Sequence, residues 1–271
     1  MATGSQRAFG AAMNLTVKAI YTAPVKSLGL QCPRTVAVDH RGIAGDRRFY
    51  LVDQRGRLLT QRELGRLVQV QAQYSVEAEL LRLRFPSGLE LAGPPEPSRA
   101  IGTVIWGRRV RGHILEGDWN DALSEFCGQP VFLVASDVAG QAFDEYPVSI
   151  LSQASVDYLG RQSGSAPALD NRRFRPSFLL EGGPPHVEDS WLGGAIRLGE
   201  SLRLQVVARD PRCAIVTQDP DTGQRDLDAL RLILDYRPNP RAAYFGVYGL
   251  VEQPGTVSVG DAVSVLAARD P

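Results

Sequence analysis

Turns containing glycine or proline follow one another so closely in this chain that long helices have little room. Short apolar and β-branched segments lie between the turns; residues 48–52 and 58–61, for example, flank Asp53-Gln-Arg-Gly56. This spacing is typical of antiparallel strands joined by hairpins. No glycine-rich phosphate-binding motif follows a strand, which argues against a parallel nucleotide-binding sheet. We therefore predict a mostly β protein with a few short helices, built of β-barrels.

The few expected helices each follow a residue that can cap the first turn. They are residues 119–127 after Asp118, a helix ending near Gln162 after Ser152 or Ser155, and residues 227–234 after Asp226.

A proline-rich loop at residues 93–98 is the natural place to divide the chain. We expect an N-terminal β-barrel over residues 13–100 and a second domain over residues 101–268. Residues 1–12 are small and polar, and are predicted to be a disordered extension or a remnant of cloning.

Charge and cysteine content exclude several classes of protein. The 271 residues carry 30 basic and 30 acidic side chains, so the basic excess of a nucleic-acid or membrane-surface binder is missing. No segment reaches the roughly 18 consecutive apolar residues of a membrane helix. Three cysteines lie far apart without a CxxC pair, which argues against a disulfide scaffold or a zinc site. We expect a cytoplasmic protein with neither nucleic-acid nor membrane partners.

One cysteine stands in a setting suited to chemistry. Cys213 follows Arg212 and lies near Arg209, ahead of an apolar run and the turn at residues 218–223. Positive charge favours the thiolate, which is a nucleophile and a ligand for soft metals. Taken alone, however, a cysteine beside an apolar run is more often a packing residue.

Polar residues also gather at the ends of several predicted strands. Each group could be a solvated strand end with a weak surface ion pair, but together they could bind a phosphate or a heterocycle. Sequence spacing alone does not show that they converge. The segments are Pro24-Val-Lys-Ser27, Asp46-Arg-Arg-Phe-Tyr50, Thr60-Gln-Arg62 and Asn171-Arg-Arg-Phe-Arg175.

Two local predictions concern the arginines of these segments. Strand alternation places Arg47 and Arg48 on opposite faces. Pro176 predicts an extended conformation for the preceding Arg175.

A longer ordered set of motifs resembles the MOSC family, named for the C-terminal domain of molybdenum cofactor sulfurase. The resemblance includes a MOSC-associated N-terminal β-barrel and is nearest to the mitochondrial amidoxime reducing component and its bacterial relatives. The motifs are Pro24-Val-Lys-Ser27, residues 45–52, Leu59-Thr-Gln-Arg62, residues 171–176, Glu188-Asp-Ser-Trp191, Pro211-Arg-Cys213, Asp219-Pro-Asp-Thr-Gly223 and residues 254–261.

The resemblance implies a molybdenum–molybdopterin cofactor held between two barrels, with Cys213 as the molybdenum ligand and catalytic residue. Pro211 differs from the mitochondrial relatives, which have a serine at this position, so the substrate preference can differ. The other residues implied to contact the cofactor are Lys26, Ser27, Arg48 and Arg175, which hold the pterin and its phosphate, and Asp144, Tyr146 and Tyr248.

The reaction implied is the two-electron reduction of N-hydroxylated compounds such as hydroxylamines, amidoximes and N-hydroxylated bases. The chain lacks the cysteine cluster of a ferredoxin domain, so the expected electron donor is a separate ferredoxin, flavodoxin or cytochrome b5-like protein. Two alternatives remain open. The protein could carry the cofactor without catalysis, or it could transfer sulfur through a persulfide on Cys213.

Overall fold

The computed structural model describes residues 14–164, 169–239 and 241–266, and the predicted extension at residues 1–12 lies outside them. Strands dominate, and the described residues contain three α-helices. The predicted fold class, mostly β with a few short helices, is confirmed. None of the described helices is long and apolar enough to cross a membrane.

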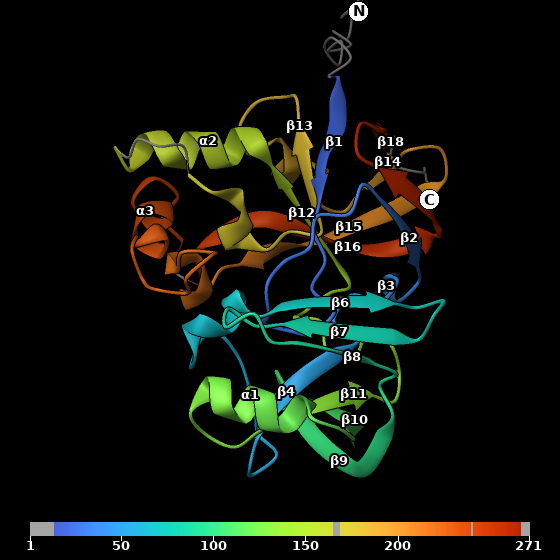
Figure 1. The fold of residues 1–271 in the computed structure, drawn as a ribbon. Helices are drawn as coiled ribbons and strands as arrows, with labels where there is room; N and C mark the ends of the chain where they lie inside the picture. Colours follow the sequence, from blue (N-terminus) through green and yellow to red (C-terminus); the bar gives the residue numbers. More distant parts are fainter. Residues whose placement is uncertain (1–13, 165–168, 240, 267–271) are drawn as a thin grey trace, which may run out of the picture.

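The upper half of the molecule in Figure 1 is a closed seven-stranded barrel. Its neighbours pair antiparallel except for β12 and β13, which are parallel and are connected through α2 (Gln153–Gln162). Fully buried apolar side chains, among them Phe178, Ile196 and Leu204, fill its interior. In order around the barrel, the strands are β1 (Leu15–Ile20), β13 (Phe178–Glu181), β12 (Val148–Ser152), β16 (Tyr244–Gln253), β15 (Leu202–Pro211), β14 (Ala195–Leu198) and β18 (Ala262–Leu266).

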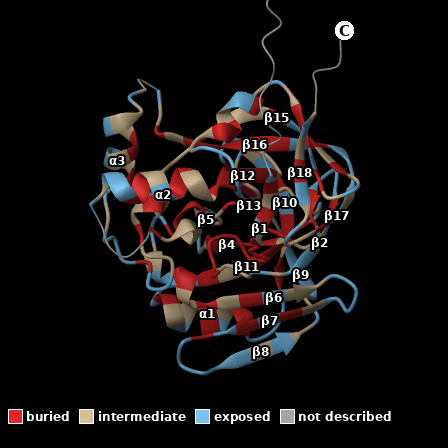
Figure 2. Ribbon diagram, turned by 90° about the horizontal axis from the view of Figure 1, so that it is seen from above, coloured by how far each residue is buried: buried red, intermediate tan, exposed pale blue. Residues whose placement is uncertain are grey.

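The lower half contains two sheets and α1 (Trp119–Cys127), which pack around Phe49, Leu83 and Leu133. Buried positions concentrate on β4 and the barrel strands, whereas β8 and most of β9 are exposed (Figure 2). The first sheet has the order β5 (Leu58–Leu59), β4 (Phe49–Asp53), β11 (Val131–Ser136), β10 (Arg108–Leu115) and β9 (Pro97–Ile105), and the second has the order β6 (Gln71–Ser75), β7 (Leu80–Arg84) and β8 (Glu90–Gly93).

The two halves share chain segments instead of dividing at one point. β1 comes first in sequence but pairs with β13 and β18 in the C-terminal barrel. Near the other end, β17 (Gly255–Ser258) pairs with β2 (Thr35–Asp39), which in turn pairs with β3 (Gly42–Ile43). The division expected at residues 100 and 101 falls inside β9, because the sheet begun by β4 continues through β9, β10 and β11.

The helix at residues 119–127 was predicted with its observed bounds, but α3 (Ala229–Tyr236) begins two residues later than expected. Asp228, not Asp226, caps it: the Asp228 side chain accepts a hydrogen bond from the Arg231 backbone N–H at 3.1 Å. Asp226 is instead paired with Arg173, at 2.5 Å between Oδ2 and Nη2. Asp226 is therefore held by an ion pair with a distant segment and does not cap this helix.

Gly65 and Gly223 bring the main chains of the two halves into direct contact. Gly65 opens the 3₁₀ helix η1 (Gly65–Gln69), and Gly223 ends the turn that begins at Asp219. A Cβ atom added to either glycine would overlap the carbonyl oxygen of the other, and Gly223 has a positive φ of 74°. Beside this contact the amides of Gln61 and Gln218 are paired, at 3.0 Å between side chains and 2.8 Å from Gln218 Nε2 to the Gln61 carbonyl.

His186 gives the fold a defined pH dependence. It precedes the 3₁₀ helix η3 (Val187–Trp191); its Nδ1 accepts a hydrogen bond from Arg237, and its Nε2 lies 3.2 Å from the Tyr236 hydroxyl. Burial and the Arg237 charge lower the pKa of His186 to about 4, although Asp189 opposes this shift. The unfolded chain, with an ordinary histidine pKa, therefore binds a proton at mildly acidic pH that the folded protein does not.

We expect the free energy of unfolding to decrease as the pH falls from about 6.5 to about 4, and His186→Asn to weaken this dependence. Asparagine accepts the left-handed backbone (φ 61°) of this position but does not titrate. Urea denaturation at several pH values gives the free energy of unfolding as a function of pH. The slope of this plot should be smaller for His186→Asn than for the wild type. Equal slopes would show that His186 titrates alike in both states.

Candidate functional site

A cavity of about 360 Å³ lies where the two halves meet. Residues from both halves and from the loop between β11 and β12 line it. They are Arg47, Arg62, Trp106, Phe143, Asp144, Glu145, Tyr146, Pro147, Ser149, Arg173, Phe174, Arg175, Ser177, Asp210, Pro211, Arg212, Cys213, Ile215, Val216 and Tyr248.

Cys213 reaches this cavity because β15 ends at Pro211. The residue is extended, with φ −123° and ψ −177°, and the short 3₁₀ helix η4 (Ala214–Thr217) starts directly after it. Its side chain is partly exposed, whereas Cys127 is buried in α1 and Cys32 is exposed outside the cavity. Cys213 is thus the cysteine placed to act on a molecule bound in the cavity.

Lys26 and Arg47 bring buried positive charge to one wall. Lys26 Nζ lies 2.7 Å from Asp144 Oδ1, and the Arg47 guanidinium is paired with Asp46. Trp106 Nε1 donates a second hydrogen bond to Asp144 Oδ1 at 3.0 Å. Enclosure would raise the pKa of Asp144, but the charges of Lys26 and Arg47 outweigh it and hold that pKa well below its usual range. Asp144 is therefore a carboxylate at neutral pH.

Arg175 is a half-buried cation of the cavity that has no direct ion-pair partner among the described residues. Its Nη2 donates to the Leu28 carbonyl at 2.8 Å, and within residues 14–164, 169–239 and 241–266 no carboxylate forms an ion pair with it. Burial, with a further contribution from Arg47, lowers the pKa of Arg175 to about 10. Asp144 and Asp46 oppose this shift only in part, so a half-buried cation without a direct ion-pair partner favours an anionic ligand here.

The backbone at Arg175 differs from our prediction. Its φ of 47° and ψ of 44° are left-handed, not extended, because the residue terminates the 3₁₀ helix η2 (Asn171–Phe174). The prediction from Pro176 was wrong. Ser27, Arg47 and Trp106 also have positive φ, so four of the six non-glycine residues in this conformation among those described lie in or beside the cavity wall. Strained backbone of this kind concentrates at functional sites.

Arg48 points away from the cavity that Arg47 lines. Its Nη1 donates to the Ser136 carbonyl, and its guanidinium carbon lies 5.7 Å from the centre of the Phe49 ring. The two arginines therefore lie on different sides of the chain, as predicted, but both precede β4 and Arg47 has a left-handed backbone, so strand alternation is not the reason. The role of Arg48 in holding a cofactor stays a prediction.

Of the remaining predicted site residues, some line the cavity and others lie behind its wall. Asp144, Tyr146 and Tyr248 line the cavity, and the rings of the two tyrosines are 5.4 Å apart. Ser27 is buried directly after Lys26 but does not line the cavity. Fold and loops together bring Asp144, Tyr146, Arg175, Cys213 and Tyr248 to one space, with Lys26 behind Asp144.

Several cavity residues were missed at the level of sequence. Arg62 and Trp106 form the rim: the exposed guanidinium of Arg62 stacks 4.1 Å from the indole ring. Arg47 and Arg62 lay inside motifs already singled out, but nothing in the spacing showed which arginine of each motif faces inward. Asp210 gives no signal of its own in the sequence, because a single aspartate at a strand end is usually solvated.

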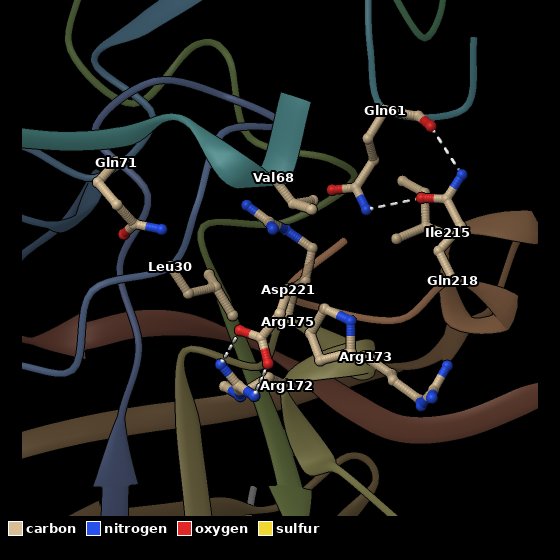
Figure 3. A pocket seen from close by; sticks show the side chains of 11 residues that line it. Leu30, Gln61, Val68, Gln71, Arg172, Arg173, Arg175, Ile215, Gln218 and Asp221 are labelled. Atoms are coloured by element: carbon tan, nitrogen blue, oxygen red, sulfur yellow. Dashed lines mark hydrogen bonds and ion pairs between the residues drawn. The ribbon is translucent and has the colours of Figure 1, made fainter. Parts of the chain in front are cut away.

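A second, smaller cavity of about 30 Å³ adjoins the first behind Arg173 and Arg175. Its walls are polar, and Figure 3 shows the paired amides of Gln61 and Gln218 on one side and the Arg172–Asp221 ion pair on the other. The volume suits about two water molecules. Arg175 therefore stands between a water-sized space and the main cavity.

Comparison with known proteins assigns both halves. Residues 14–130 match the family model of the MOSC N-terminal beta barrel domain, and residues 135–264 match that of the MOSC domain. The mouse mitochondrial amidoxime-reducing component 1 is 27% identical over an alignment of 286 positions, gaps included, that covers 93% of this chain and 82% of the relative. The Caenorhabditis elegans molybdenum cofactor sulfurase is 29% identical over 247 residues, 86% of this chain but only 33% of the relative.

Among solved structures, the YUAD protein of Bacillus subtilis aligns over 93% of this chain and 96% of its own, with a TM-score of 0.44 and 15% identity.

Proposed function

Because this chain belongs to the MOSC family, with the family's N-terminal β-barrel domain ahead of the MOSC domain, we propose that it is a molybdenum-cofactor-dependent reductase of N-hydroxylated compounds. The relatives it matches are named for amidoxime reduction and for molybdenum cofactor sulfuration. A function connected with the molybdenum cofactor is common to both.

The observation that carries the proposal is that Cys213 and Arg175, a cation without an ion-pair partner among the described residues, line the same cavity. A thiolate is a soft donor that suits molybdenum, and a buried guanidinium suits a phosphate. The residues present therefore fit a pterin cofactor that carries both a metal and a phosphate.

In this proposal each side chain has a separate task. The cofactor, when bound, supplies the two-electron redox chemistry. Cys213 would ligate the metal, and Arg175 and Lys26 would bind the phosphate and the pterin. Tyr146 and Tyr248 form an aromatic wall that limits how a substrate can approach. Pro211, next to this wall, offers no hydroxyl to the substrate.

The overall reaction converts a hydroxylamine or an amidoxime, two electrons and two protons into the reduced nitrogen compound and water. The electrons would come from a separate donor protein of the ferredoxin, flavodoxin or cytochrome b5 type. A cytoplasmic location likewise stays a prediction.

The test is to express the protein in a host that makes the cofactor and in a host that cannot. We expect the first preparation to contain close to stoichiometric molybdenum and to convert benzamidoxime into benzamidine with a chemical reductant, and the second to do neither. Stoichiometric molybdenum without turnover would indicate a carrier. A labile sulfur on Cys213 without molybdenum would indicate sulfur transfer, the function for which the nematode relative is named.

A further inference from the structure

Asp210 and Tyr248 lie side by side in the cavity wall on neighbouring strands. Ala208 of β15 pairs with Tyr248 of β16, and the register shifts between Arg209 and Pro211. Such irregularities redirect side chains next to active sites. Both side chains are nearly covered, with residue exposures of 3% for Asp210 and 6% for Tyr248, and the Tyr248 hydroxyl is close enough to the Asp210 carboxyl group to lower its pKa.

Arg212 forms a buried ion pair with this carboxyl group, but through one guanidinium nitrogen only. Arg212 Nη2 lies 2.8 Å from Asp210 Oδ2 but forms no hydrogen bond of good geometry with it or with any other described group. The guanidinium is instead held by main-chain carbonyls: Nε donates to Phe245 at 2.6 Å and Nη1 to Phe174 at 2.7 Å. Asp210 is near a fixed positive charge without the bidentate contact that would keep it ionised.

The other charges that face Asp210 favour its protonated form. Burial raises the pKa of Asp210 to about 7; Arg212 and the hydrogen bond with Tyr248 oppose this, and the negative charges of Asp144 and Glu145 add to it. The same burial, together with Asp210, raises the pKa of Tyr248, so its hydroxyl keeps its proton. An anionic molecule in the cavity would raise the pKa of Asp210 further.

The three carboxyl groups among the cavity-lining residues therefore differ in what they can do. Asp144 is held ionised by Lys26 and Arg47, and Glu145 is exposed to solvent. Asp210 alone is buried and near its titration point at neutral pH. It is also three residues from Cys213 along the same cavity wall.

We propose that Asp210, which lies beside Tyr248 in the cavity wall, is the proton donor of this cavity. This inference rests on the proposed function for the identity of the acceptor. As the N–O bond breaks, the Asp210 carboxyl proton passes to the departing oxygen, which leaves as water. The two electrons come from the reduced donor protein, and the second proton comes from solvent. Asp210 is then reprotonated from solvent, with the Tyr248 hydroxyl holding its carboxyl in place.

The decisive comparison is between the wild type, Asp210→Asn and Tyr248→Phe, each measured per bound molybdenum across a range of pH. Glu252→Gln, an exposed carboxyl paired with Arg203 far from the cavity lining, is the matched control. We expect wild-type turnover to fall as the pH rises through the pKa of Asp210. General acids typically contribute about 10²–10⁴-fold, so Asp210→Asn should lower kcat by at least about 100-fold at neutral pH and lose this basic limb.

Tyr248→Phe should keep the limb but shift it to higher pH, because the hydrogen bond that stabilises the ionised carboxylate is removed. Glu252→Gln should match the wild type. If Asp210→Asn retained the wild-type kcat and pH profile per molybdenum, Asp210 would only balance the charge of Arg212 and the inference would be wrong.

A readout without cofactor separates this inference from the proposed function. Infrared difference spectra of the cofactor-free protein should show a protonated carboxyl that titrates near neutral pH in the wild type and is missing from Asp210→Asn. An Asp210 that is ionised throughout the range from about pH 5 to 9 would overturn the inference. Molybdenum-loaded wild type without turnover would overturn only the reductase proposal.

Discussion

Cys213→Ser should abolish molybdenum-dependent reduction and leave the protein folded. Serine keeps the size and extended backbone of this position, but its oxygen is a hard donor that replaces the soft thiolate poorly. Losing a partner that merely orients a metal ligand already costs about 10–100-fold in activity or affinity, so losing the ligand atom itself should cost more than about 100-fold. Turnover per protein, together with the molybdenum content, measures this effect.

Stability should change little in this variant, because the Cys213 side chain is partly exposed and substitutions at such positions usually stay within about 0.5 kcal/mol. Cys32→Ser is the matched control, since Cys32 is an exposed thiol outside the cavity. Normal turnover of Cys213→Ser would remove the cysteine from the site and with it the main support for a metal in this cavity.

Arg175→Gln should lower cofactor content by at least about tenfold, which corresponds to about 1.4 kcal/mol of binding free energy. Glutamine can still donate a hydrogen bond to the Leu28 carbonyl, but it offers no charge to a phosphate. The apoprotein should be about as stable as the wild type, because the variant removes a half-buried charge that forms no ion pair with a carboxylate among the described residues.

Arg48→Gln provides the contrast for this prediction. Arg48 donates to the Ser136 carbonyl and packs on Phe49 outside the cavity lining. Loss of the Arg48 guanidinium should lower the melting temperature of the apoprotein and leave the cofactor content close to that of the wild type. Molybdenum analysis and thermal denaturation of both variants test this contrast. If Arg48→Gln lost more cofactor than Arg175→Gln, Arg48 would be the more important of the two for holding the cofactor, as the family resemblance implied.

Much of the fold was predictable because its signals are local. Turns such as Asp53-Gln-Arg-Gly56 and the helix after Asp118 depend on residues within a few positions of one another. The start of α3 was not predictable from nearby residues, because Asp226 pairs with Arg173, which lies 53 residues away in the sequence. The membership of β1 in the C-terminal barrel was missed for the same reason: its partners, β13 and β18, lie far along the chain.

The site shows a similar limit. The motifs containing Lys26, Arg175 and Cys213 were recognisable, and Arg47 and Arg48 were correctly predicted to lie on different sides of the chain. The sequence did not show which of the two arginines faces the cavity, because Arg47 has a left-handed backbone (φ 46°) that strand geometry does not anticipate. Asp210 depends on a register shift in β15, a feature set by pairing with β16 and not by its own neighbours.

The contact between Gly65 and Gly223 has a consequence for how such proteins can diverge. Where side chains separate two packed units, substitutions can change the spacing by a methylene at a time. Here main-chain atoms touch, so the separation of the halves is fixed by atomic radii that no exchange of side chains elsewhere can alter. The Gly65–Gly223 contact therefore limits how closely the two halves can approach each other, whatever side chains line the cavity between them.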